Sequence, residues 1–216
     1  MTAVSTGPVA GLRARKKQRT RDALIDAAFG LFQRKGFDAT TIDEIAAEVE
    51  VSPRTFFRYF DSKEDVALSL QAQQLAALAT ALAARPAGEP VLTAMRRATV
   101  AIMRACERGT GGFDAARFTC VQRMIRDSPT VYARSLELCA TQLAELAARI
   151  AARMGVDPAK DPRPTLVAAV ATTAVQTAVH AWRAAEPGRS ASSLADRALA
   201  LLEQGINYPA AAPPGS

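Results

Sequence analysis

The sequence predicts an all-α protein in which a small N-terminal three-helix domain precedes a larger helical bundle. Ala and Leu, which are strong helix formers, dominate the second half of the chain. Long runs of Val, Ile, Thr and Tyr with the alternating pattern of a strand are missing. The chain has 216 residues, of which 49% are hydrophobic and 22% charged, so it can bury a substantial core.

Capping signals mark the first helices. Residues 19–35 carry an apolar stripe with helical spacing, and Gly36 is a natural stop after it. Thr41, with Glu44 three positions later, forms the capping-box pattern, in which each side chain satisfies a backbone N–H group of the other. This pattern predicts a second helix over residues 42–49.

A third helix follows after a short break. Ser52 is a favourable N-cap, and Pro53 suits the first helical position. This third helix is short and ends near Phe60. Ser62 then caps a fourth, long helix that we expect to run without interruption to about Ala84.

Five more helices are predicted in the second half, separated by short breaks rich in Pro and Gly. They cover residues 91–107, 115–126, 130–154, 163–185 and 191–205. The ends of the chain, residues 1–12 and 209–216, are rich in Pro, Gly, Ala and Ser and are expected to be disordered tails.

The positive charge of the chain is concentrated near its N-terminus. The formal net charge is +6, which is compatible with a nucleic-acid partner, but the position of the charge is more informative than its sum. Cations at a helix N-terminus oppose the helix macrodipole, so a phosphate backbone is the simplest reason for them. The alternative is a solvated charged face. The six cations are Arg13, Arg15, Lys16, Lys17, Arg19 and Arg21.

The first three helices have the spacing of a helix-turn-helix, whose last helix enters the DNA major groove. This spacing also occurs in other helical bundles. In the third helix, PRTFFRYF, Phe56 and Phe60 can dock inward and leave the intervening polar side chains exposed. Arg54 and Arg58 then suit a phosphate or a bidentate contact to guanine, the alternative being an ordinary basic turn.

The stretch from Thr20 to Leu68 resembles the N-terminal domain of the TetR family. Three pieces match in order: AAxxLFxxxGF, TTIxEIA and VSxxTFFxYFxSKED. The resemblance implies a homodimer with an N-terminal DNA-binding domain, here residues 13–61, and a ligand-binding and dimerisation domain, here residues 62–208. Such regulators are usually repressors that leave a palindromic double-stranded operator when a ligand binds.

The resemblance also implies roles for individual residues. Thr41 matches a phosphate contact at the N-terminus of the second helix, and Lys63 matches a phosphate-binding lysine. Ser52, Thr55 and Tyr59 match contacts of the recognition helix. The complete set expected to bind DNA is Arg15, Lys16, Lys17, Arg19, Thr41, Ser52, Pro53, Arg54, Thr55, Phe57, Arg58, Tyr59 and Lys63.

Three positions depart from the commonest family pattern. Glu50 stands where the turn often has Gly, so we expect a non-glycine residue in a strained conformation. Phe57 stands where Tyr is usual, which removes a hydroxyl group that could bind phosphate. Arg54 stands where Gly is common and offers a base contact in compensation.

A weaker resemblance concerns the second half. The segments IRDSPTVYARSLE and GVDPAKDPRPTLVAAV, with Ala181–Trp182, are similar to a subgroup that includes mycofactocin-type regulators. This resemblance implies a small apolar or acyl-CoA-like ligand. Candidate pocket residues are Met103, Phe113, Phe118, Met124, Tyr132, His180 and Trp182. The alternative for each is a core side chain, or for His180 a hydrogen-bonded structural histidine.

The last two helices, within residues 163–205, are rich in Ala and suit a dimeric four-helix bundle, with a monomeric bundle as the alternative. An enzyme is a rival class, but a single histidine, no phosphate-binding glycine loop and no metal-ligand spacing argue against it. We expect neither cofactor nor metal. A helical scaffold is a second rival, although it would not need the exposed PRTFFRYF segment behind a basic arm.

No signal peptide or membrane-spanning stretch is recognised, so we expect a cytoplasmic protein that does not enter a membrane. Cys106, Cys120 and Cys139 are odd in number and lack zinc-site spacing, which predicts reduced, buried thiols.

Overall fold

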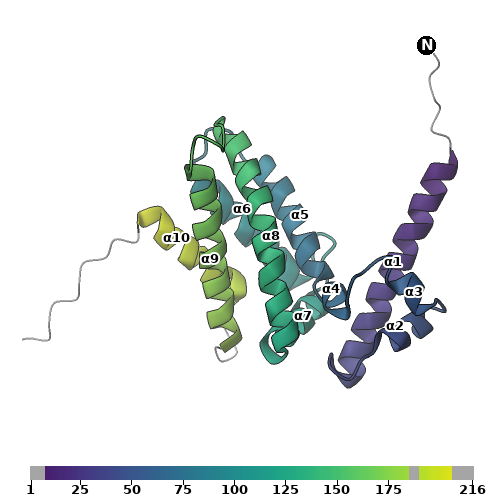
Figure 1. The fold of residues 1–216 in the computed structure, drawn as a ribbon. Coiled ribbons are helices and arrows are strands. Elements are labelled where there is room, and N and C mark those ends of the chain that lie inside the picture. The colour runs from purple at the N-terminus through teal and green to yellow at the C-terminus, as the bar shows by residue number, and fades with distance from the viewer. Residues whose placement is uncertain (1–7, 185–189, 206–216) are drawn as a thin grey trace, which may run out of the picture. The chain divides into compact units, whose positions relative to one another are not determined.

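The computed structural model describes residues 8–184 and 190–205, and these ranges contain ten helices and no strand (Figure 1). The prediction of an all-α fold is therefore confirmed. The helices are α1 (Pro8–Lys35), α2 (Ile42–Glu48), α3 (Pro53–Phe56), α4 (Lys63–Ala67), α5 (Ser69–Ala83), α6 (Val91–Arg108), α7 (Ala115–Asp127), α8 (Pro129–Met154), α9 (Arg163–Ala184) and α10 (Ala191–Gln204).

The first helix begins earlier than predicted. We expected a tail over residues 1–12, but α1 starts at Pro8, because proline is accepted in the first turn and the following residues do not interrupt a helix. Residues 1–7 of that expected tail, and the whole of the tail predicted over 209–216, lie outside the described residues.

The expected long fourth helix is interrupted at Leu68. Its backbone has φ −89° and ψ 5°, and its N–H group is shared between the carbonyl oxygens of Glu64 and Val66. The helix therefore ends at Ala67 and restarts at Ser69. No Pro or Gly marks this position. Leu68 is almost fully buried at this break.

The chain divides into two compact units. Unit 1 contains the chain up to Gln73 together with Thr119–Leu136, and unit 2 contains the remainder. Two contacts explain why α4 belongs to unit 1. It packs against α1, and the Asp65 carboxylate accepts a hydrogen bond of 2.8 Å from Arg134 of α8. Ser62 caps α4, which lies in unit 1.

Unit 2 has an apolar core, and an ion pair and hydrogen bonds also join α6 to α10. α10 packs against both α6 and α9, and Met103, Ala178, Ala191 and Ala195 form one buried cluster. The Arg96 guanidinium forms an ion pair of 2.7 Å with Asp196. At the start of α10, the backbone N–H and hydroxyl of Ser192 donate to the carboxylate of Glu107 at 2.9 and 2.6 Å.

Within residues 8–184 and 190–205, no helix combines the length and the apolar character needed to cross a bilayer.

Candidate nucleic-acid interface

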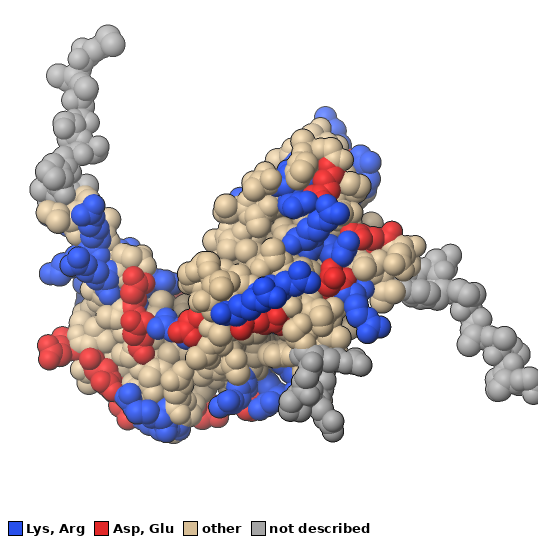
Figure 2. Space-filling model, turned by 180° about the vertical axis from the view of Figure 1, so that it is seen from behind, with Lys and Arg blue, Asp and Glu red and all other residues tan. Residues whose placement is uncertain are grey.

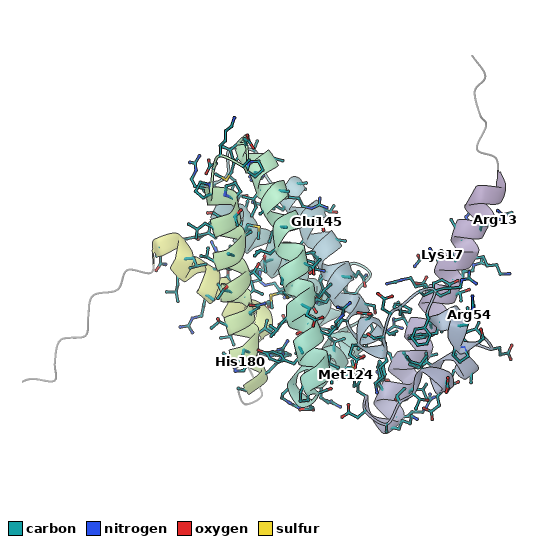
Figure 3. The ribbon with its side chains drawn as sticks, in the orientation of Figure 1. Arg13, Lys17, Arg54, Met124, Glu145 and His180 are labelled. Carbon is teal, nitrogen blue, oxygen red and sulfur yellow. The ribbon has the colours of Figure 1, made fainter. Side chains whose placement is uncertain are left out.

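The N-terminal part of α1 is a cationic arm. All side chains from Gly11 to Arg19 are exposed, and Figure 2 shows Lys and Arg side chains gathered there. Arg13 and Lys17 are labelled on this part of the helix in Figure 3. The charged groups of five of these cations form no hydrogen bond or ion pair with any described residue, so they are available to a ligand. These five are Arg13, Arg15, Lys16, Lys17 and Arg19.

The sixth cation of the arm has a different role. The guanidinium of Arg21 lies over the ring of Phe60, 5.0 Å from its centroid, which is a cation–π geometry. This contact holds α1 against the end of the segment from Pro53 to Phe60, which we call the recognition segment. Sequence reasoning missed it because the two residues are far apart in the chain and only the fold brings them together.

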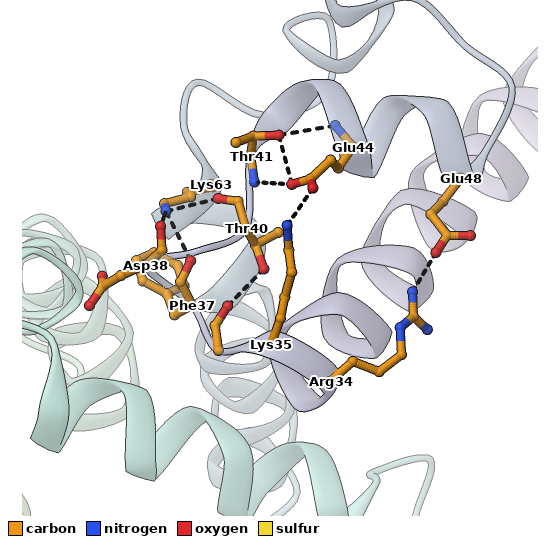
Figure 4. A network of polar contacts seen from close by, with 10 residues as sticks. Arg34, Lys35, Phe37, Asp38, Thr40, Thr41, Glu44, Glu48 and Lys63 are labelled. Carbon is orange, nitrogen blue, oxygen red and sulfur yellow. Dashed lines mark hydrogen bonds and ion pairs between the residues drawn. The ribbon is translucent and has the colours of Figure 1, made fainter.

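The predicted capping box of α2 is present (Figure 4). The Thr41 hydroxyl accepts from the Glu44 N–H at 3.2 Å, and the Glu44 carboxylate accepts from the Thr41 N–H at 2.8 Å. Glu44 also pairs with Lys35 of α1. The hydrogen bond from Lys35 and those from Thr41 lower the pKa of Glu44 from 4.5 to about 2. This end of α2 is therefore fixed to α1.

The turn between α2 and α3 contains the strained residue expected from the sequence. Glu50 has φ 54°, the only positive φ of a non-glycine residue in the described chain. The Val51 N–H returns to the Ala46 carbonyl at 3.0 Å, which closes the turn. A side chain in this left-handed region costs free energy that glycine avoids.

α3 is short but continues as helical turns to Phe60. Ser52 caps it, its hydroxyl accepting from the Thr55 N–H at 3.2 Å. Beyond the helix, the Tyr59 and Phe60 N–H groups both donate to the Phe56 carbonyl, at 2.9 and 3.2 Å. Phe56 and Phe60 are buried, as expected.

Arg54, Phe57 and Arg58 are exposed on this segment, whereas Thr55 and Tyr59 are half-buried. Arg54 forms no hydrogen bond or ion pair with the described residues. The guanidinium of Arg58 lies over the ring of Tyr59, 5.8 Å from its centroid. The segment therefore offers the guanidinium of Arg54 on a helical turn whose phenylalanines Phe56 and Phe60 are buried.

Lys63 contacts the loop between α1 and α2. Its ammonium group donates to the carbonyl oxygens of Phe37, Asp38 and Thr40 at 2.9, 3.3 and 3.0 Å, and it lies 4.4 Å from the centroid of the Phe37 ring (Figure 4). An ammonium group has three N–H donors, so all are used. Lys63 therefore ties the start of α4 to the loop between α1 and α2.

The expected ligand residues fall in both units. In unit 2, the rings of Phe118 and Trp182 stack with centroids 5.9 Å apart at 28°, and Trp182 also packs on the cluster that contains Met103. Phe113, in the loop before α7, is buried. Met103, Phe118 and Trp182 are thus brought together.

The other candidates are not part of this group. Met124 and Tyr132 belong to unit 1, where Met124 is buried and Tyr132 is exposed. His180 is exposed on α9. Helical spacing could not distinguish these positions because it does not reveal which helices meet.

No group of three or more His, Cys, Asp or Glu side chains within the described ranges is placed to hold a metal ion. The thiols at positions 106, 120 and 139 are not in disulfides, and only Cys106 is fully buried. Burial raises the pKa values of Cys106 and Cys120, which disfavours the reactive thiolate.

A capped recognition helix, a closed turn and an adjacent cationic arm define a helix-turn-helix DNA-binding protein. Comparison with known families agrees. The profile of "Bacterial regulatory proteins, tetR family" matches residues 24–70, and that of the "MftR C-terminal domain" matches residues 89–207, more than half of the chain. The chain belongs to the TetR family, whose members are transcriptional regulators and not enzymes.

Similar proteins support this assignment. The HTH-type transcriptional regulator TcmR of Streptomyces glaucescens is 44% identical over 161 residues, which cover 74% of this chain and 71% of TcmR. The structure of FadR from Thermus thermophilus, a repressor in complex with lauroyl-CoA, matches with a TM-score of 0.55 and 25% identity over 90% of this chain and all of that one. FadR from Bacillus halodurans shares the fold, with a TM-score of 0.53. Its sequence is 18% identical, and the match covers 88% of this chain and 97% of that one.

Proposed function

We propose that this protein is a ligand-responsive repressor that binds a palindromic operator as a homodimer and leaves it when a small apolar or acyl-chain ligand binds. The observation that carries the proposal is the pairing of an exposed recognition helix with a cationic arm, in which five of the six charged groups have no partner among the described residues. A regulator of this kind would act in the cytoplasm, where bacterial DNA lies.

The DNA contacts divide into two kinds. The arm residues Arg15, Lys16, Lys17 and Arg19 would bind phosphates without regard to sequence, as would the N-terminus of α2 at Thr41. Arg54 and Arg58 would reach base edges or phosphates from the recognition segment, together with Ser52, Pro53, Thr55 and Tyr59. Phosphate contacts would fix the register, and base contacts would supply the specificity.

The surface of α9 supports a dimer. Leu166 is 61% exposed and shares one uncharged helix face with Thr173, Thr177 and His180. On α10, Leu201 is 46% exposed. Apolar and small uncharged side chains on neighbouring helices suit a self-complementary interface with two-fold symmetry. Two-fold symmetry would in turn require two matching operator half-sites.

The ligand proposal rests on the aromatic pair of unit 2. Phe118 and Trp182 present stacked rings beside Met103, Val175 and Val179, an apolar environment suited to an acyl chain. The similar Thermus thermophilus repressor was crystallised with lauroyl-CoA, so an acyl-CoA is the first ligand to test.

Selection of binding sequences from random DNA duplexes tests the proposal. We expect the selected sequences to share a near-palindromic consensus. A labelled duplex that carries this consensus should bind two protein chains, and lauroyl-CoA should weaken that binding. Light scattering of the protein without DNA should give the mass of a dimer. Recovery of no preferred sequence would contradict the proposed function, and a monomeric mass would contradict the interface on α9 and α10.

A further inference from the structure

Phe57 is an exposed aromatic side chain on the recognition segment. It is 53% exposed, whereas its neighbours Phe56 and Phe60 are buried and anchor the segment. A single exposed apolar residue is ordinary on a protein surface. This one lies on the helix that would face the DNA bases, so its surroundings decide whether it has a function.

The surroundings of Phe57 are cationic. Arg54 precedes it by three positions and Arg58 follows it directly, and all three side chains are exposed. Residues three apart in a helical segment share a face, and the Phe57 N–H bonds to the Pro53 carbonyl at 3.1 Å, which places this turn in helical geometry. The exposed ring therefore lies beside a guanidinium group that has no internal partner.

The ring of Phe57 is also held in place. It meets the ring of Phe56 edge to face, with centroids 5.5 Å apart at 86°. This geometry is favourable for aromatic pairs, and Phe56 is itself fully buried. This contact favours one orientation of the Phe57 ring before any DNA arrives.

The chemistry of phenylalanine then restricts what it can read. The ring has no strong hydrogen-bond donor or acceptor, so it cannot replace the phosphate contact of a tyrosine hydroxyl. Among the base edges of the major groove, only thymine offers an apolar group, its 5-methyl. A guanine beside that thymine would present two acceptors to Arg54.

We propose that Phe57 is a specificity-determining residue that packs against the 5-methyl group of a thymine in each operator half-site, next to a guanine read by Arg54. This inference rests on the proposed function, because it requires that α3 enters the major groove. It goes further by naming the chemical group that one side chain recognises.

Replacing thymine by deoxyuridine tests the proposal, since it removes only the methyl group and keeps the base pair. In the consensus duplex, each thymine is replaced in turn and its symmetry mate with it. For the wild-type protein we expect one thymine position in each half-site at which the replacement weakens binding. The loss should be about fourfold for each half-site, because burial of a methyl-sized group contributes about 0.8 kcal/mol. For the Phe57→Ala variant, thymine and deoxyuridine at that position should bind equally.

Two further variants make the test specific. Arg54→Ala is the matched control, since it should bind more weakly yet keep the preference for thymine over deoxyuridine. Phe57→Gln, of similar length but polar, should lose that preference, and it provides a second reading if Phe57→Ala is less stable. If wild-type protein binds every deoxyuridine duplex equally well, or Phe57→Ala keeps the preference, the assignment of Phe57 is wrong while DNA binding stands. If no consensus duplex exists, the proposed function itself fails.

Discussion

Replacing Lys63 by methionine distinguishes the role implied by the family resemblance from the role that the structure gives it. The side chain keeps its length, but the ammonium group that binds three carbonyl oxygens is lost. The bonds to Phe37 and Thr40 are partly buried, and the bond to Asp38 is exposed. With about 1.5 kcal/mol for each of the two partly buried, charge-assisted bonds, Lys63→Met should lower the free energy of unfolding by about 3 kcal/mol.

The assay must report on unit 1. Trp182, the only tryptophan, lies in unit 2, so its fluorescence would not follow the α1–α2 turn. Urea unfolding followed by circular dichroism, with hydrogen exchange of the Thr40 and Thr41 amides, measures the loss where it should occur. Lys160→Met is the control, since that side chain is 85% exposed and should change stability by less than about 0.5 kcal/mol. Unchanged stability of Lys63→Met, with a salt slope of DNA binding lowered by about one unit, would refute the structural role and support a phosphate contact.

Three other substitutions test the recognition segment, the turn before it and the capping box of α2. Arg54→Ala should cost about 1–3 kcal/mol of operator binding and relax the preference at one base position per half-site, measured by binding to single-base variants of the consensus; an unchanged preference would show that Arg54 does not read a base. Glu50→Gly should raise the free energy of unfolding by about 1 kcal/mol, because φ 54° is strained for glutamate, and a lower value in urea unfolding would argue against that strain. The pKa of Glu44 is about 2 in the folded protein, against the ordinary value of 4.5. The ionised Glu44 carboxylate therefore contributes stability above pH 4.5, and this contribution is lost as the pH falls toward 2. Glu44→Gln should therefore lose less stability than wild type over this interval, and equal acid sensitivity of the two proteins would contradict the capping-box contacts.

Local signals predicted most of the fold. The Thr41–Glu44 capping box, the Ser52–Pro53 start of α3 and the inward docking of Phe56 and Phe60 are all fixed by residues close in sequence, and all were confirmed. The strain at Glu50 was likewise expected from the turn in which it lies.

Several features of the fold that the sequence did not reveal have no local signal. The break at Leu68 has no Pro or Gly to announce it, and Asp65 joins unit 1 through Arg134 of α8. The three carbonyl partners of Lys63 and the ring under Arg21 also lie far from them in the chain. Such partners are determined by how helices pack, which hydrophobic periodicity does not specify.

Reciprocal coupling between the two proposed sites is the most direct test of a ligand-responsive repressor. Lauroyl-CoA is titrated into the protein with and without saturating consensus duplex, and binding is followed through the fluorescence of Trp182, the only tryptophan, which stacks on Phe118. If ligand weakens operator binding by a factor in the range of about 5 to 150, operator must weaken ligand binding by that same factor. Equal affinity for lauroyl-CoA in the two titrations would contradict the proposed coupling, even if both the ligand and the operator bind.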